Sequence, residues 1–329
     1  MKKITFLASN RDISVGSYRI WVNDLSLHLK ECNVSCDIVS DPRIALANQS
    51  EVIICAKSDA AYAPGLKQAN ENKIVGVINL AADSSIRPDF IIAGSVEEKI
   101  SLSHHKNVFL VPLLENMYQD SDAYKAHTPK DKIRVGFHGS HSHLGKFDFG
   151  LKQALENYEL EQDLELLILT SDPNYKWQVG RPDIKNIIVK KWDFKTVKED
   201  LLSCDVGVVP NVTKIQLDKD NPDLSTDLGR YNTDFAMRFK NKSNSGRNFV
   251  FHQLGIPVIA DLTPSNLHIL GNPDCGFVAQ DTQSWLMALR SLGDHEKRKK
   301  IAASAKAEFD RLYNPLIWAQ RLHRNIEEI

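Results

Sequence analysis

"RFKNKSNSGRNFVFHQLGIPVIAD", residues 238–261, is the stretch that decides the fold. A short apolar segment after Gly246 leads through a glycine turn at Gly255 into the apolar run Val258–Ala260. Short, almost wholly apolar strands that alternate with helices are typical of a parallel sheet covered on both faces. The stretch therefore predicts a helix followed by a buried strand in an α/β protein.

Apolar strands and amphipathic helices alternate along the whole chain, with one polar interruption. We predict two tandem Rossmann-like domains, each a doubly wound parallel sheet, facing a cleft. We place the first domain at residues 1–116, a linker at 117–132 and the second domain at 133–313, and we expect the terminal helix, 314–329, to pack back on the first domain. The long polar segment 213–239 is predicted to be a lid, because long loops inside compact domains are usually functional.

The periodicity also predicts the individual elements. Strands are expected at residues 4–9, 36–39, 51–57, 73–81, 89–95, 107–115, 133–140, 164–171, 186–193, 205–212, 257–260 and 275–280. Helices are expected at residues 17–31, 63–72, 96–105, 149–160, 195–204 and 282–293, from about residue 296, and after Pro315.

Composition excludes several classes of protein. The 329 residues are 42% hydrophobic and 25% charged, as in ordinary globular proteins, and a net charge of −1 gives no general affinity for nucleic acid. No apolar run reaches the roughly 20 residues of a membrane-spanning helix, and the opening "MKKITFLASN" is too short a run for a signal peptide. The five scattered cysteines are expected to be reduced structural thiols, which favours the cytoplasm.

Positive charge collects where the quoted helix begins. Small residues there let an anion approach the backbone, and the helix N-terminus carries unpaired N–H groups and a partial positive charge. The sequence therefore predicts a phosphate site made by Ser243, Asn244, Ser245 and Gly246, with Lys242 and Arg247 adding charge and Arg238 and Lys240 as further contacts or lid anchors. The alternative is an ordinary surface helix, capped by Ser243 or Asn244, with its cations in water.

A second polar loop, "GFHGSHSHLGK" at residues 136–146, directly follows a predicted strand. Gly139 and Ser140 suit a tight turn, and Lys146 is placed to reach a phosphate. Three histidines, His138, His141 and His143, lack a cysteine or carboxylate at zinc-site spacing, so no metal site is predicted. They are expected either to contact a ligand or to be plain turn residues.

In the first half, Gly16, Ser17, Tyr18 and Arg19 open the first helix. They are predicted to hold a polar or anionic part of a second substrate, and the alternative is a cap with a buried tyrosine. No nucleophile elbow, Walker sequence or Gly-x-Gly-x-x-Gly follows the first strand of either domain, which argues against nucleotide hydrolysis and hydride transfer.

At this point the chain resembles glycosyltransferases of the GT-B fold, most closely the family-four-like group. The resemblance is best over residues 132–329 and is carried by "SGRNFVFHQLGIPVIAD", "CGFVAQDTQSWLMALRSL" and "RKKIAASAKAEFDRLYNPLIWAQRL". The group usually carries two glutamates eight positions apart around the donor helix, where this chain has Lys242 and Val250. This departure leaves open an acidic sugar, an unusual nucleotide, or a member that binds without transferring.

The resemblance implies transfer of a sugar from a nucleotide sugar to an acceptor hydroxyl in glycan biosynthesis, with no metal and no cofactor. Lys242, Arg247 and the backbone of Ser245 and Gly246 would stabilise the leaving diphosphate, with His138 and His141 as acid–base candidates by position. The acceptor is a glycan, a lipid-linked compound or another hydroxyl compound, so peripheral membrane contact stays open. Two alternatives remain: a non-catalytic two-lobed protein that binds a phosphorylated or sugar ligand, and a sugar-nucleotide epimerase of the same fold.

Overall fold

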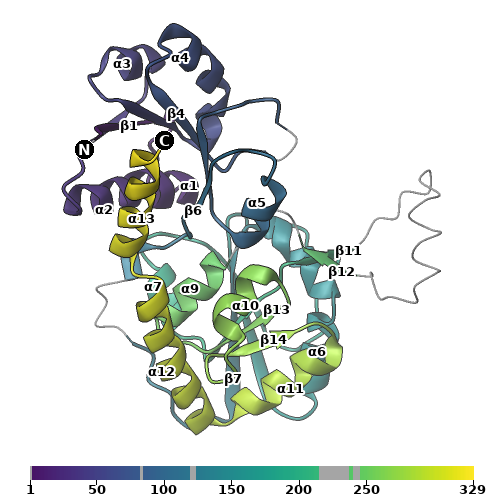
Figure 1. The fold of residues 1–329 in the computed structure, drawn as a ribbon. Coiled ribbons are helices and arrows are strands. Elements are labelled where there is room, and N and C mark those ends of the chain that lie inside the picture. The colour runs from purple at the N-terminus through teal and green to yellow at the C-terminus, as the bar shows by residue number, and fades with distance from the viewer. Residues whose placement is uncertain (1, 82–83, 119–123, 215–236, 240–244) are drawn as a thin grey trace, which may run out of the picture. The chain divides into compact units, whose positions relative to one another are not determined.

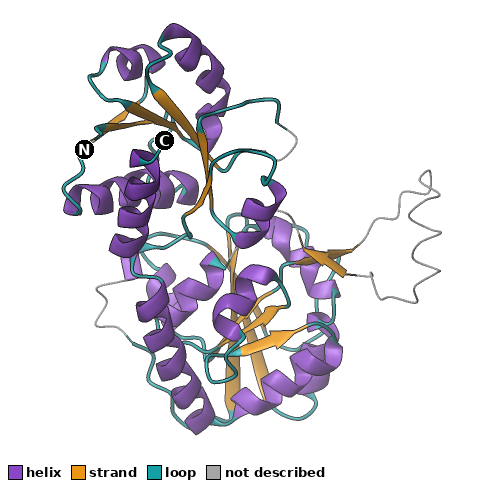
Figure 2. Cartoon of the chain, viewed as in Figure 1, coloured by secondary structure: helices purple, strands orange, loops and turns teal. Residues whose placement is uncertain are grey.

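The structure is a computed structural model that describes residues 2–81, 84–118, 124–214, 237–239 and 245–329 (Figure 1). The chain divides into two compact units. The first comprises Met1–Asp122, Asn244–Gln253 and Ala307–Ile329, and the second comprises Ala123–Ser243 and Leu254–Lys306. In each unit the strands are flanked by helices (Figure 2).

The first unit contains a parallel sheet of six strands in the order β2-β1-β3-β4-β5-β6. The strands are β1 Ile4–Leu7, β2 Cys36–Val39, β3 Val52–Cys55, β4 Ile74–Ile78, β5 Phe90–Ala93 and β6 Val108–Leu110. The helices are α1 Gly16–Tyr18, the π-helical η1 Arg19–Asp24, α2 Leu25–Glu31, α3 Pro42–Ala47, η2 Lys57–Tyr62, α4 Ala63–Ala69, α5 Val96–Ser101, η3 Asn116–Tyr118, α9 Gly246–Gln253 and α13 Pro315–Glu327.

Both faces of this first sheet are buried, because successive strand residues point to opposite sides. Ile4 and Phe6 of β1 join a core on one face, and Leu7 of the same strand joins the core on the other. Helix α13 packs on α2 and places Ala319 and Leu322 in the first of these cores. This double burial explains why the strands read as almost continuous apolar runs.

The second unit contains a parallel sheet of six strands in the order β14-β13-β10-β7-β8-β9. The strands are β7 Lys132–Gly139, β8 Asp163–Thr170, β9 Ile187–Lys191, β10 Val206–Val209, β13 Val258–Asp261 and β14 Phe277–Ala279. A separate antiparallel pair is formed by β11 Val212–Lys214 and β12 Met237–Phe239. The helices are η4 His141–Asp148, α6 Leu151–Glu159, α7 Val197–Leu202, α10 Pro264–Leu270 and α11 Thr282–Gly293, while α12 His295–Leu312 contributes to both units.

These two doubly wound sheets confirm the predicted α/β fold class. Each strand expected from the sequence is present, shortened by a few residues at one or both ends in most cases. Helices α3 and α10 were not expected, and the predicted lid lies outside the described residues apart from its ends in β11 and β12.

Helix α9 groups with the first compact unit, as do residues 307–313, although both lie within the predicted range 133–313 of the second domain. The reason lies in its aromatic contacts, because the ring of Phe249 lies 4.2 Å from that of Tyr313 and 5.5 Å from that of Phe309. Within the part of the chain that is described, no helix has the length and apolar character needed to cross a bilayer.

Candidate functional site

The strand order of the second sheet marks where a ligand would bind. Strands β8 and β9 follow β7 on one side, whereas β10, β13 and β14 lie on the other. The strand order therefore reverses between β7 and β10, and in open α/β sheets ligands bind beyond the carboxyl ends of the strands at such a point. The loops after β7 and β10 are the first place to look for a site.

The loop after β7 begins with a backbone conformation that favours glycine. Gly139, the last residue of β7, has φ of +143°, a region that residues with a side chain rarely adopt. Ser140 then caps the 3₁₀ helix η4, with its hydroxyl accepting from the N–H of Ser142 at 3.3 Å. The predicted turn at Gly139 and Ser140 is therefore present at the carboxyl end of the central strand.

Lys146 ties this loop to the neighbouring strands. Its ammonium donates to the carbonyl oxygen of Asn211, just after β10, at 2.7 Å, and the residue is only 5% exposed. The backbone N–H of Asn211 donates in turn to the buried carboxylate of Asp261 at the end of β13. Three loops at the carboxyl edge thus share one polar network, with a cation and a carboxylate at the point where the strand order reverses.

Two of the predicted histidines lie at this same edge. His138, the penultimate residue of β7, is 8% exposed. His141 Nδ1 lies 3.3 Å from the hydroxyl of Ser171, and its ring lies 4.7 Å from the ring of Tyr175. The loops after β7 and β8 therefore meet at His141, and the acid–base role of either histidine stays a prediction. Among the described residues, no three His, Cys, Asp or Glu side chains are grouped as metal ligands would be.

Sequence reasoning missed three polar residues at the carboxyl edge, two of which, Asn211 and Asp261, belong to the network around Lys146. Asp261 follows the apolar strand β13 directly, and its carbonyl oxygen accepts from Asn266 Nδ2 at 2.7 Å. Thr170 ends β8 fully buried, and its hydroxyl has no hydrogen-bond partner in the described part of the chain. A polar residue at the carboxyl end of an apolar strand was the available signal for Asp261 and Thr170, and Asn211 follows β10 in the same way.

The predicted cationic helix start is only partly described. Ser245 is buried, and Gly246 and Arg247, the first residues of α9, are half-buried. Arg238 is described in its backbone alone, in β12, where it is paired with Thr213 of β11. The other predicted contacts at this site lie outside the described residues: Lys240, Lys242, Ser243 and Asn244. Phosphate binding at α9 therefore stays a prediction.

In the first unit, the predicted acceptor residues open helix α1. Ser17 is exposed and makes no side-chain cap, whereas Gly16 and Tyr18 are half-buried. Arg19 is 5% exposed and forms a two-pronged ion pair with Glu115, at 2.9 Å from Nε and 2.7 Å from Nη2. Burial opposes the charged form, but the bonded Glu115 carboxylate raises the pKa of Arg19 above its usual value. Arg19 therefore holds this part of the first unit together, and acceptor binding by the four residues stays a prediction.

Comparison with known proteins extends this picture at the level of the fold. No family model matches the chain, and no curated protein matches it by sequence. Solved structures match over the full length. HepE from Anabaena, solved with UDP and glucose, is 10% identical with a TM-score of 0.65, and the match covers 100% of both chains. HepE has also been solved with UDP-glucose, with a TM-score of 0.63 over 100% of both chains.

Two further solved structures share the architecture. Sucrose-phosphate synthase from Thermosynechococcus elongatus is 14% identical, with a TM-score of 0.68 over 100% of this chain and 99% of that one. A protein assigned as a UDP-N-acetylglucosamine 2-epimerase from Listeria monocytogenes is 12% identical, with a TM-score of 0.52 over 99% and 95%. The chain therefore has the two-domain Rossmann-like fold of the GT-B glycosyltransferases, as the resemblance implied.

Proposed function

We propose that this protein transfers a sugar from a nucleotide-sugar donor to an acceptor hydroxyl. The observation that carries the proposal is the full-length match to HepE, a protein solved with UDP-glucose. In the reaction, the acceptor oxygen forms a bond to the anomeric carbon while the bond from that carbon to the diphosphate oxygen breaks. The acceptor proton passes to a base, and the diphosphate leaves with an added negative charge.

The proposed donor contacts in the second unit are Gly139, Ser140 and Lys146. These residues follow β7 at the point where the strand order of the sheet reverses, which is where ligands bind in such sheets. The Lys146 ammonium there is held in place by the carbonyl of Asn211. A cation fixed before the reaction begins stabilises a leaving phosphate well, because it needs no reorganisation when the charge develops.

For the start of α9 we propose a phosphate seat made by Ser245, Gly246 and Arg247. Its support is chemical: the first N–H groups of a helix are unpaired within the helix, and they point toward an anion there. We further propose that Lys146, Arg247 and the N–H groups at the start of α9 take the place of a divalent metal. The five free thiols support a reducing, cytoplasmic setting.

Nucleotide binding and sugar transfer test this proposal directly. Thermal unfolding with a panel of nucleoside diphosphates should show stabilisation by at least one of them, since a ligand of the folded state raises its stability as RT ln(1 + [L]/Kd). Lys146→Met and Arg247→Ala should each lower transfer roughly tenfold or more, the cost of one charge-assisted contact. The matched control is Lys299→Met, because Lys299 is exposed on α12.

Three outcomes would count against parts of the proposal. If no nucleoside diphosphate stabilises the protein and no nucleotide sugar is consumed, the transferase proposal fails. Loss of activity in EDTA would overturn the metal-free part alone. Conversion of a UDP-sugar to its isomer without any acceptor would favour the epimerase alternative, which shares the fold.

A further inference from the structure

The opposite edge of the second sheet holds a polar cavity of about 350 Å³. It lies where β7, β8 and β10 begin, and it is lined by Lys125, Lys130, Lys132, Arg134, Glu165, Ser203 and Asp205. Lys132 and the carboxyl-edge Gly139 stand at the two ends of β7, which spans seven residue steps of about 3.3 Å, or about 23 Å. The cavity is therefore well separated from the loops that follow the strands.

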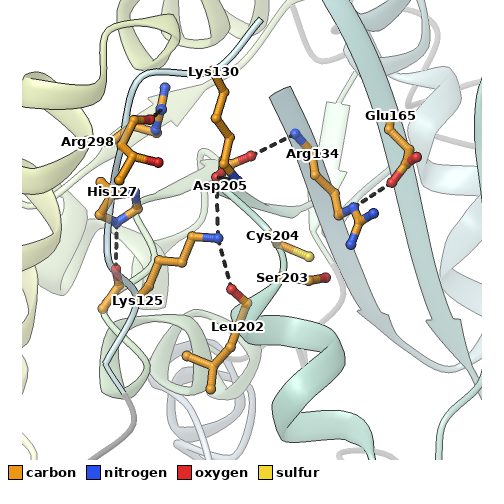
Figure 3. A network of polar contacts seen from close by, with 12 residues as sticks. Lys125, His127, Lys130, Arg134, Glu165, Leu202, Ser203, Cys204, Asp205 and Arg298 are labelled. Atoms are coloured by element: carbon orange, nitrogen blue, oxygen red, sulfur yellow. Dashed lines mark hydrogen bonds and ion pairs between the residues drawn. The ribbon is translucent and has the colours of Figure 1, made fainter. Parts of the chain in front are cut away.

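Two lysines in this cavity share a single carboxylate. Lys125 Nζ lies 3.3 Å and Lys130 Nζ 2.8 Å from the same oxygen of Asp205, as Figure 3 shows. The other oxygen of Asp205 accepts from the backbone N–H of Arg134 at 3.0 Å. Burial raises the pKa of Asp205, but the hydrogen bonds from Lys130 and Arg134 outweigh it and leave the pKa below its usual value. The single negative charge of Asp205 is therefore shared by two ion pairs and balances only one of the two lysines.

The remaining charges lie on the strands themselves. Arg134 of β7 and Glu165 of β8 are direct neighbours in the sheet, and Arg134 Nε lies 2.5 Å from the Glu165 carboxylate (Figure 3). Within the described part of the chain, Nη1 and Nη2 of Arg134 have no acceptor. Lys132 lies two residues earlier in β7, on the same face of the sheet, and its exposed ammonium has no acceptor among the described residues either.

The charge of the cavity is therefore unbalanced. Four cations, Lys125, Lys130, Lys132 and Arg134, face two carboxylates, a surplus of two positive charges. Buried Arg298 lies near the cavity and adds to this field (Figure 3). Its Nη1 donates to the carbonyl of Leu292 at 2.7 Å. Burial lowers the pKa of Lys125 and of Arg298, because their charged forms are less favourable in the folded protein than in water. A bound dianion would relieve that cost.

We propose that this cavity binds a phosphorylated small molecule through its phosphoryl group. A phosphate monoester carries close to two negative charges at neutral pH, which matches the surplus. The free fork of Arg134 suits two phosphoryl oxygens, and Lys132 supplies a mobile third donor. A volume of about 350 Å³ is within the usual range for small-molecule sites. Because the cavity lies at the amino edge of the sheet, a ligand there would bind away from the loops proposed to hold the donor.

Isothermal titration with inorganic phosphate tests the proposal without any nucleotide, at an ionic strength held constant with sodium chloride. Wild-type protein should bind phosphate, and glycerol 3-phosphate should bind in the same way whereas glycerol should not. Lys132→Ala with Arg134→Gln should weaken phosphate binding at least about tenfold, the loss expected for charge-assisted hydrogen bonds. Lys132→Ala alone, at an exposed position, should weaken it less and serves if the double variant does not fold.

Two matched variants separate this site from the donor site. Lys299→Ala, on the exposed face of α12, should keep wild-type phosphate affinity. Arg247→Ala, at the proposed donor phosphate, should keep the phosphate binding that the Lys132 and Arg134 variants lose. Phosphate affinity that is lost in Arg247→Ala and kept in the Lys132 and Arg134 variants would overturn the proposal. So would the same affinity in all variants, or no phosphate binding by the wild type at millimolar concentration. None of these results depends on whether the protein transfers a sugar.

Discussion

His252 should make the stability of this protein depend on pH in a measurable way. Its side chain is fully buried on α9, and neither ring nitrogen has a hydrogen-bond partner among the described residues. Burial disfavours the charged ring and lowers the pKa of His252 from 6.5 to about 3 in the folded chain. The unfolded chain, by contrast, takes up this proton as the pH falls below 6.5.

The sign and size of the effect follow from this difference. Because the folded pKa is depressed, stability is retained above pH 6.5 and is lost as the pH falls from 6.5 toward 3. At pH 5 the pH lies 1.5 units below the pKa of 6.5 in the unfolded chain, whereas the folded histidine stays mostly neutral. At about 1.36 kcal/mol per unit, the free energy of unfolding falls by about 2 kcal/mol. His252→Leu removes this titration, so the variant should lose about 2 kcal/mol less than wild type between pH 7 and pH 5.

Urea denaturation of both proteins at pH 7 and pH 5, followed by circular dichroism, gives the required free energies of unfolding. Other titrating groups, such as His127, are present in both proteins, so the difference between their pH profiles isolates His252. Phe251→Leu, at the neighbouring buried position on α9, removes no titrating group and is the control, so its pH profile should run parallel to that of wild type. Parallel profiles for wild type and His252→Leu would refute the reasoning, whatever the stability of the variant at pH 7.

Two further predictions concern stability at single positions. Gly150→Ala should cost about 1–3 kcal/mol and lower the unfolding temperature, because Gly150 has φ of +96° and a Cβ there would lie 2.7 Å from the backbone nitrogen of Thr282. Gly145→Ala, where a Cβ meets none of the described residues within 4 Å, is its control, and equal melting temperatures would contradict the steric argument. Arg19→Met should lower the free energy of unfolding, measured in urea, by about 3–5 kcal/mol, because it leaves the Glu115 carboxylate, whose side chain is 13% exposed, without its cation. Adding Glu115→Leu should recover part of that loss, and no recovery would mean that the ion pair is not the cause.

Local patterns in the sequence were enough to predict most of the secondary structure. The apolar runs 52–55 and 206–209 became wholly buried strands, because residues that are apolar on both faces can only be accommodated inside a covered sheet. The two missed helices, α3 and α10, also had a readable signal. Each begins with a capping side chain before a proline, Asp41 before Pro42 and Thr263 before Pro264, and both caps are formed.

The carboxyl-edge site was predictable only in part. The glycine turn at Gly139 and the position of His141 follow from a loop placed after a strand, which is local information. The sequence did not predict that Lys146 donates to the carbonyl of Asn211, because the two residues are 65 positions apart. The lysine was predicted to reach a phosphate, and its observed partner depends on which strand lies beside β7.

The sequence alone determined the class of fold, the alternation of its elements and the loops rich in polar groups, since each depends on residues close together in the chain. Tertiary structure alone decided which loops and strand ends meet. In a parallel sheet neighbouring strands are joined through helices, so residues that touch at one edge are far apart in sequence. Arg134, Glu165 and Asp205 meet at the amino edge in this way, across 31 and 71 positions, and no local pattern marks them as one site.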